Sequence, residues 1–189
     1  PHGVDHDFFT PAKDKEKTRT NILSKLKVLH DGYPYPIPNE KYFLHVGELN
    51  LARKNMVRLI DAFVKSRELG LKHNLIIAGK HTKELEHICI NKSGIFLLDW
   101  ISNNDLLDLI QGADAFLLPS IHEGFGMPLV EAMACGIPCI SSNRHSPPAV
   151  IEDVGILVNP YSETEISNAM LSLANNSKLL EELSEKSLK

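Results

Sequence analysis

Two glutamates on either side of a glycine-containing loop are the residues of this sequence best suited to chemistry. Glu123 comes directly before Gly124-Phe125-Gly126, and Glu131 lies in the apolar segment that follows. Glycine permits backbone conformations that other residues resist, so such a loop can shape itself around a ligand. A carboxylate beside the loop can accept hydrogen bonds from sugar hydroxyls. The second carboxylate could hold another group, such as a ribose diol.

The residues around this loop predict a strand, a loop, a helix and a second strand. The apolar run 115–118 is short enough for a buried strand. Residues 127–134 have the apolar spacing and alanines of a helix, and Pro128 is tolerated in its first turn. Gly136 suits the position just after the helix, before the apolar pair 139–140. The loop is therefore expected at the carboxyl end of a strand, where open α/β sheets bind ligands.

The start of this predicted helix determines which ligand suits the loop. A helix that begins near Gly126 offers free N–H groups and the positive end of its dipole. Phosphate is the natural occupant of such a position. The same field favours an ionised Glu123, which suits a hydrogen-bond acceptor better than a general acid.

The segment from Glu123 to Pro138, E-G-F-G-M-P-L-V-E-A-M-A-C-G-I-P, resembles the E-x7-E signature of the retaining GT-B glycosyltransferases of family 4, the glycosyltransferases group 1. The resemblance extends from Pro1 to about Ala174. It implies the Rossmann-like C-terminal domain that binds the nucleotide-sugar donor. It further implies that Glu123 orients the donor sugar and that Glu131 binds the ribose hydroxyls. The remaining donor contacts that it implies in this segment are Gly124, Phe125, Gly126 and Met127.

Two cations follow a predicted strand at 42–47 and begin the next helix. Arg53 and Lys54 could neutralise a diphosphate there, an arginine doing so with two hydrogen bonds. By themselves they are also typical surface charges. In the family, the lysine of R-K-N or R-K-G binds the donor phosphates, so the resemblance assigns that role to Lys54, with Arg53 as second choice. Many members carry a further arginine where this chain has Glu48, so the basic clamp is incomplete.

Two other segments acquire a role through the resemblance. Asp99-Trp100-Ile101 stands where members usually carry G-Y-V or G-F-V, whose backbone contacts the nucleotide base. Trp100 could fill the aromatic position and Ile101 could supply backbone hydrogen bonds, or this only tryptophan could anchor a core. The P-H-G-V-D start resembles the interdomain crossover of the family and places Gly3 near the donor cleft. Ala149 stands where relatives carry a glutamate, so no acidic role is assigned there.

Strands alternate with helices along the whole chain, which predicts an α/β fold with one doubly wound, Rossmann-like parallel sheet, the C-terminal half of a GT-B enzyme. We expect a single nucleotide-sugar-binding domain over 1–189, with a crossover segment and connector at 1–41 and the core and C-terminal helices at 42–189. Expected strands lie at 42–47, 74–79, 95–98, 115–118, 139–143 and 155–160. Expected helices follow Asn55, span 83–90, start at a cap of Asn103 or Asn104, span 127–134, and form a pair in 162–189.

Three other segments have distinctive compositions. The charge-rich stretch 11–27 is expected to be a solvated helix or a mobile loop rather than a lipid-binding surface, because acidic and basic residues alternate in it. The proline-rich stretch 33–38 must be extended. Residues 145–150 are expected to form a loop.

The composition excludes several classes of protein. The 189 residues, 43% hydrophobic and 23% charged, suffice for one core of an ordinary globular domain. A net charge of −4 does not argue for nucleic acid. No apolar run approaches the roughly 18 residues of a membrane span. Peripheral attachment to the inner membrane face is common in the family, but no residue here supports it.

Cysteine and histidine usage bears on the compartment and on metals. Cys89, Cys135 and Cys139 form no disulfide framework, which favours a reducing cytoplasm. Cys135 and Cys139 are expected to be small core residues. The nine histidines show no H-E-x-x-H or paired Cys/His spacing, so we predict no protein-bound metal. The chain also lacks a D-x-D motif, as the family usually does, which agrees with a reaction that needs no metal and no cofactor.

The resemblance implies an enzyme that transfers a sugar from a UDP- or GDP-sugar with retention of configuration, and the R-K-N motif leans towards GDP-mannose. A glycan or lipid-linked acceptor would bind an N-terminal domain that lies outside this sequence, so this chain alone is expected to lack full activity. A non-catalytic nucleotide-sugar-binding module is therefore the main alternative. A glycosidase would use two carboxylates but needs one protonated. A dehydrogenase would need G-x-G-x-x-G where the chain reads Gly47-Glu48-Leu49-Asn50.

Overall fold

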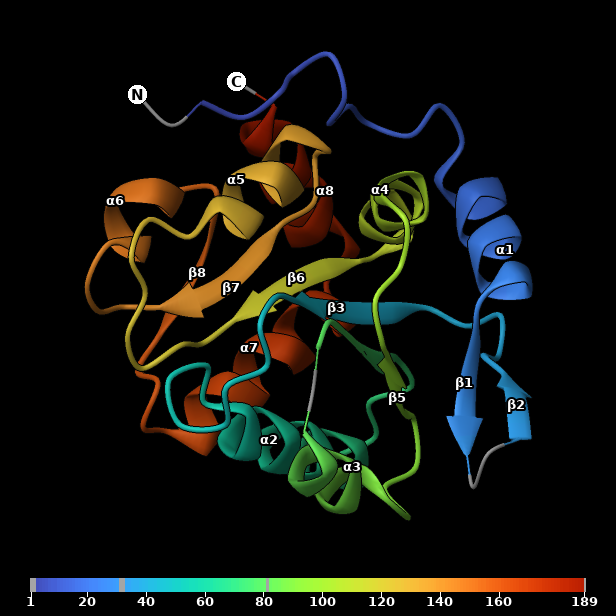
Figure 1. Ribbon diagram of the computed structural model, residues 1–189. Coiled ribbons are helices and arrows are strands. Elements are labelled where there is room, and N and C mark those ends of the chain that lie inside the picture. The colour runs from blue at the N-terminus through green and yellow to red at the C-terminus, as the bar shows by residue number, and fades with distance from the viewer. Residues whose placement is uncertain (1–2, 31–32, 81, 189) are drawn as a thin grey trace.

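Six parallel strands form one twisted sheet, in the order β5-β4-β3-β6-β7-β8 (Figure 1). The computed structural model describes residues 3–30, 33–80 and 82–188. The strands are β3 (Tyr42–Val46), β4 (Asn74–Ala78), β5 (Ile95–Leu98), β6 (Ala115–Leu118), β7 (Cys139–Ser142) and β8 (Gly155–Val158). All of the expected strands are present, so the doubly wound parallel sheet is confirmed.

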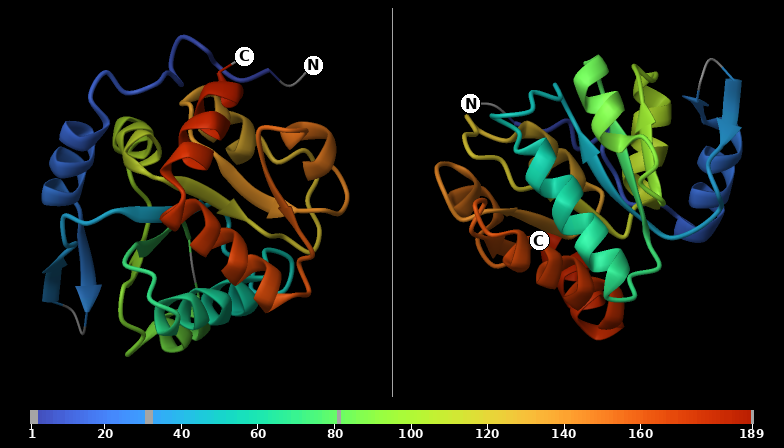
Figure 2. Two further views of the ribbon diagram at one scale, coloured as in Figure 1. Left: turned by 180° about the vertical axis from the view of Figure 1, so that it is seen from behind. Right: turned by 90° about the horizontal axis from the view of Figure 1, so that it is seen from below.

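Helices cover both faces of the sheet, and the two layers are separate in Figures 1 and 2. One face carries α2 (Met56–Glu68), α3 (Lys83–Cys89) and α7 (Glu163–Asn175). The other carries α1 (Lys15–Lys25), α4 (Asn103–Gly112), α5 (Met127–Ala134) and α6 (Pro147–Ile151). The last helix, α8 (Ser177–Ser187), leads from α7 to α5, where Ser184 donates a hydrogen bond to the Gly136 carbonyl. Within the described ranges, no helix is both long and apolar enough to cross a bilayer.

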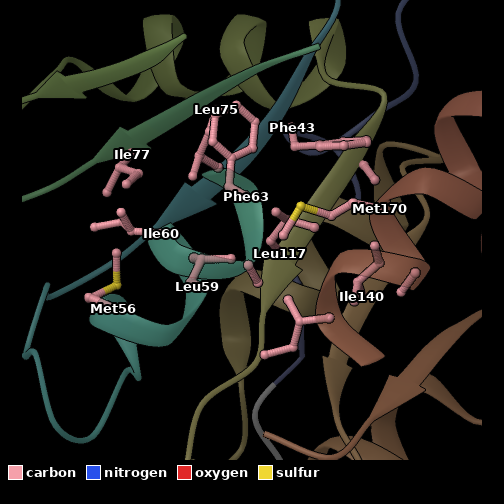
Figure 3. Close-up of a cluster of buried hydrophobic side chains, with 14 of the residues drawn as sticks. Phe43, Met56, Leu59, Ile60, Phe63, Leu75, Ile77, Leu117, Ile140 and Met170 are labelled. Carbon is pink, nitrogen blue, oxygen red and sulfur yellow. The ribbon is translucent and has the colours of Figure 1, made fainter. Parts of the chain in front are cut away.

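Strand side chains alternate between two cores, as the pleat requires. Phe43 and Leu117 point to the α2 and α7 face, where they meet Phe63 and Met170 (Figure 3). Leu44 and Phe116 point to the opposite face, towards α4 and α5. Each of these large side chains is fully buried, and burial stabilises the fold by about 1.5–3 kcal/mol per side chain.

The first part of the chain joins the second core. The charge-rich stretch forms α1, which buries Ile22 and Leu23 against α4, so it is packed rather than only solvated. The proline-rich stretch is extended, as expected. It forms β2 (Tyr33–Pro36) and pairs in antiparallel fashion with β1 (Lys27–His30), a hairpin that the sequence did not predict.

Two expectations for local structure were wrong. The cap of α4 is Ser102 rather than Asn103 or Asn104, and its hydroxyl accepts a hydrogen bond from the Asp105 amide. The segment 145–150, expected to be a loop, contains most of α6. Its two prolines occupy the first turn of the helix, where a missing N–H leaves no hydrogen bond unmade.

A buried cluster of charges ties α1 to the amino-terminal edge of the sheet. Asp114 accepts hydrogen bonds from Arg19 at 2.5 Å and from His73 at 3.0 Å, and Lys15 lies 3.3 Å away. Burial alone would raise the pKa of Asp114, but the His73 hydrogen bond and the charges of Lys15 and Arg19 outweigh it and lower that pKa. The ionised form of Asp114 therefore stabilises the folded state.

Replacement of Asp114 by asparagine should lower the free energy of unfolding by about 3 kcal/mol at neutral pH, because Arg19 is left buried without its counter-ion. The folded-state pKa lies below the ordinary value of 3.8, so this stabilisation is complete above that pH and is lost as the pH falls through the folded-state pKa. The difference between wild type and Asp114→Asn should therefore shrink in acid. Urea denaturation at several pH values measures it, with exposed Asp7→Asn as the control. An equal difference at all pH values would contradict this assignment.

Candidate functional site

The sheet has its topological switch point between β3 and β6. The chain leaves β3 for α2 on one face of the sheet, and it leaves β6 for α5 on the other (Figure 1). The two strands pair only at Phe43 with Ala115 and Leu44 with Phe116. Their following loops therefore diverge at the carboxyl edge, a position where ligands bind in open α/β sheets. We call the region between these two loops, residues 47–55 and 119–126, the crevice.

A buried ion pair bridges the two loops at this crevice. The Lys54 ammonium, just before α2, lies 2.6 Å from the Glu123 carboxylate, just before α5. The two side chains are only 7% and 11% exposed. Sequence reasoning assigned both residues to one site, and the fold brings them into direct contact. Such a pair is costly to remove from water unless each charge keeps its partner.

The backbone around this pair is braced by hydrogen bonds between loops. The Arg53 carbonyl accepts a hydrogen bond from the Ile121 amide at 3.0 Å. Asn55 adopts a left-handed conformation with φ of 59° and donates its side-chain amide to the carbonyls of Pro119 and Pro160. Asn55 thereby connects the loops that follow β3, β6 and β8. The positions of Lys54 and Glu123 are therefore held from both sides of the crevice.

The Arg53 side chain lies in different surroundings from Lys54. Its guanidinium lies 3.2 Å from the carboxylate of Glu48, and both side chains are largely exposed, at 45% and 76%. Glu48 is the residue at the position where the family resemblance led us to expect an arginine. An exposed pair of this kind contributes little to stability, so Arg53 is available to a ligand at small cost.

The glycine loop places unpaired amides next to Glu123. Gly126 has a φ of +81°, and a Cβ added there would lie 3.0 Å from Leu129, so only glycine fits without strain. Within the described part of the chain, the backbone amides of residues 124–127 donate no hydrogen bond. Phe125 is 46% exposed, and Met127, the first residue of α5, is half-buried. These amides can receive an anion at the start of the helix.

Glu131 lies on α5 with its carboxylate free. It is half-buried, and among the described residues its side chain forms no hydrogen bond or ion pair. Burial raises the pKa of Glu131. A carboxylate that is partly desolvated and has no partner is suited to accept hydrogen bonds from a ligand.

The remaining candidates lie at the ends of other segments. Trp100, after β5, is 80% exposed, so the interpretation that it anchors a core was wrong. Ile101 is half-buried against the core beneath α4. Gly3 lies in an exposed segment with open space around its α-carbon. Nothing in the geometry tests the donor contacts expected for these three residues.

Sequence reasoning missed other residues at the carboxyl edge. His45 on β3 is fully buried, and its Nδ1 lies 2.7 Å from the Leu117 carbonyl. The rings of His122 and His145 lie edge to face, with centroids 4.4 Å apart. A polar residue within the apolar run Tyr42–Val46 was a signal that could have singled out His45. The approach of His122 to His145 depends on tertiary structure and has no such signal.

The described ranges contain no group of three or more His, Cys, Asp or Glu side chains arranged to hold a metal ion. All three cysteines are free and buried, so Cys135 and Cys139 are core residues, as expected.

The Lys54–Glu123 pair should show strong energetic coupling. Lys54→Met and Glu123→Gln should each destabilise the fold by about 3 kcal/mol, because each leaves a buried charge alone, whereas the double variant should recover most of that loss. Urea denaturation of the four proteins gives the coupling free energy. The exposed pair Arg53 and Glu48 provides a matched cycle, for which we expect less than about 1 kcal/mol. Equal coupling in the two cycles would contradict the assignment.

Comparison with known proteins identifies the family of this chain. The family model for glycosyl transferases group 1 matches residues 34–189. O-antigen chain mannosyltransferase B of Escherichia coli is 32% identical over 144 residues, covering 72% of this chain and 38% of that protein. The serotype-specific mannosyltransferase WbdA of Escherichia coli is 30% identical over 155 residues, covering 77% of this chain and 18% of that protein. The chain thus spans less than half the length of these relatives.

Solved structures share the fold. The C-terminal domain of a glycosyl transferase group 1 family protein, LpcC, from Francisella tularensis has a TM-score of 0.78 at 23% identity, covering 98% of this chain and 95% of that one. HepE from Anabaena, solved with UDP-glucose, has a TM-score of 0.79 at 18% identity, covering 98% of this chain and 50% of that one. The sheet and its helices match the C-terminal domains of GT-B glycosyltransferases. The chain belongs to the glycosyl transferases group 1 family.

Proposed function

We propose that this chain is the C-terminal donor-binding domain of a retaining family 4 glycosyltransferase, and that it binds a nucleotide-diphosphate sugar in the crevice between β3 and β6. One observation carries the proposal: a buried lysine–glutamate pair bridges the switch point of the sheet. The unpaired amides of residues 124–127 lie next to this pair. The site thus combines a cation, oriented N–H groups and a carboxylate, which are the groups that a sugar diphosphate requires.

The proposed chemistry is stabilisation of the leaving group. Cleavage of the bond between sugar and phosphate places negative charge on the departing β-phosphate. Lys54 and the amides at the start of α5 stabilise that charge, as donors fixed in position before the reaction. Arg53 is the second cation and reaches the phosphates by leaving its exposed partner Glu48. No step in this scheme requires a metal ion.

The contact between Lys54 and Glu123 allows both buried charges to stay paired before and after the donor binds. Without ligand, each charge neutralises the other inside the protein. A donor diphosphate replaces Glu123 as the partner of Lys54, and Glu123 is released to accept hydrogen bonds from the sugar hydroxyls. Both buried charges therefore keep a partner throughout, which avoids the cost of a lone buried ion.

The nucleoside part of the donor is proposed to lie towards α4 and α5. Glu131 accepts hydrogen bonds from the ribose hydroxyls, while the backbone at Ile101 and the ring of Trp100 contact the base. Two relatives at 30–32% identity are mannosyltransferases by name, which favours a mannosyl donor such as GDP-mannose. HepE, solved with UDP-glucose, shares only the fold with this chain. The binding experiment described below therefore includes UDP and UDP-glucose as well.

The acceptor is proposed to bind a separate N-terminal domain and to be a glycan or a lipid-linked glycan. The relatives are much longer than this chain, which supports such a division of labour. The three unpaired cysteines suit a reaction in the cytoplasm.

Titration of the protein with UDP, GDP, ADP, GDP-mannose and UDP-glucose, followed by thermal unfolding, tests the proposal. A true donor nucleotide at about 100 times its dissociation constant should stabilise the fold by roughly 2.7 kcal/mol. The double variant Lys54→Met/Glu123→Gln lacks both buried charges. It should remain folded but should no longer be stabilised by the nucleotide. A response to none of these nucleotides, also in the presence of an N-terminal domain, would refute donor binding. A response without sugar transfer by the two domains together would indicate a binding module instead.

Glu131→Gln should weaken nucleotide binding without weakening the fold. Burial raises the pKa of Glu131, so its ionised form costs folding free energy and a neutral glutamine removes that cost. We expect thermal stability equal to or above wild type at neutral pH, together with about a tenfold loss of nucleotide affinity. Calorimetric titration and thermal unfolding measure the two effects. A stability loss that accompanies the affinity loss would assign Glu131 to packing instead.

A further inference from the structure

Three polar groups at the base of the crevice have hydrogen-bonding capacity that is not used. Within the described residues, the buried Lys54 ammonium has one hydrogen-bond acceptor, Glu123, although an ammonium carries three donors. His45 is fully buried, yet its Nε2 has no hydrogen-bond partner. The hydroxyl of Ser120, in the loop after β6, is also buried without a partner. Unsatisfied polar atoms are rare inside proteins, so a group of them calls for an explanation.

The Leu117 carbonyl determines what His45 can offer. A carbonyl oxygen only accepts hydrogen bonds, so the Nδ1 that lies 2.7 Å from it carries the hydrogen and donates. Burial lowers the pKa of His45 to about 4, which keeps the ring neutral at physiological pH. In a neutral ring with its hydrogen on Nδ1, Nε2 is a bare acceptor. His45 therefore presents a hydrogen-bond acceptor at Nε2, and the Lys54 ammonium has donors without an acceptor.

His45 also lies within reach of the ion pair. It is the fourth residue of β3, whose following loop carries Lys54, and it is bonded to β6, whose following loop carries Glu123. The charges that act on the ring are those of Lys54 and Glu123. The unmet donors of the ammonium and the unmet acceptor of the imidazole thus both lie on elements that meet at the switch point.

We propose that His45 is a positioning residue for Lys54, whose ammonium it holds through Nε2 by way of one water molecule. The role rests on the proposed function, in which Glu123 leaves Lys54 for the donor sugar. His45 then keeps the ammonium directed into the crevice while the diphosphate replaces the carboxylate. Being neutral, His45 does this without competing for the positive charge that the phosphates require.

Two amide substitutions separate this role from a structural one. Gln can place its amide oxygen where Nε2 lies, whereas Asn reaches only the Nδ1 position and keeps the donor to Leu117. We expect His45→Asn to lower the affinity for the nucleoside diphosphate that binds wild type by about tenfold, and His45→Gln to recover most of it. Circular dichroism and urea denaturation establish that both variants fold. Wild-type affinity in His45→Asn, or no recovery in a folded His45→Gln, would overturn the proposal.

A second measurement needs no nucleotide. In protein with ¹⁵N-labelled histidine, two ring-nitrogen resonances are absent from His45→Asn, and the one without an attached hydrogen is Nε2. We expect this resonance to shift in Lys54→Met/Glu123→Gln, because the ammonium that holds the bridging water is gone, while that of the exposed His6 stays in place. An unchanged Nε2 resonance would overturn the role of His45 whatever the protein binds. Absence of nucleotide binding in the wild type would instead refute the proposed function, and the resonance would still decide the contact.

Discussion

Two neighbouring strands that pair over only two positions create the space on which the rest of this structure depends. Beyond Leu44 and Phe116, β3 and β6 no longer exchange the backbone contacts that hold the other strands together. The chain turns to opposite faces of the sheet at this point, so the loops that follow the two strands lead apart. Polar groups that reach across from the two loops bridge this gap. Lys54 and Glu123 do so, and their contact is the interaction around which the surrounding loops are arranged.

The two ends of the sheet contain buried charges that are organised differently. At the amino-terminal edge, Asp114 is surrounded by Arg19, Lys15 and His73, so its charge is compensated several times over. At the carboxyl edge, Lys54 and Glu123 have each other, and the polar atoms beside them have no partner. A fully satisfied cluster stabilises a fold, whereas an incomplete one is ready to accept a further group. The Asp114 cluster thus differs from the Lys54–Glu123 pair in how completely its charges are compensated.

Much of this architecture could be predicted from the sequence, because local signals agree with the fold. The apolar run at 115–118, the glycine loop and the helix at 127–134 occupy the predicted positions. Segments whose structure depends on small differences in free energy were harder to predict. The prolines at 147 and 148 can begin a helix as well as prevent one, and Ser102 competes with two neighbouring asparagines for one cap. For the site, the residues could be predicted from the sequence, but the contacts between them could not. The pairing of Arg53 with Glu48 and the orphaned nitrogen of His45 depend on side-chain directions that no spacing encodes.

Asn55 has a consequence for how this site can change over time. One buried amide holds the carbonyls of Pro119 and Pro160, and its own backbone adopts a conformation that few residues tolerate. Its replacement would release three loops at once, would leave the buried Pro119 carbonyl unpaired, and would leave the Pro160 carbonyl with only the Arg58 guanidinium, 3.5 Å away. The exposed side chains that these loops carry, such as Arg53 and Phe125, are under no such constraint, because they are not held in the interior of the protein. Exposed positions such as Arg53 can therefore be exchanged while the loop frame that Asn55 holds persists. Asn55 therefore limits change in the loop backbone, whereas the exposed side chains on these loops are free to vary.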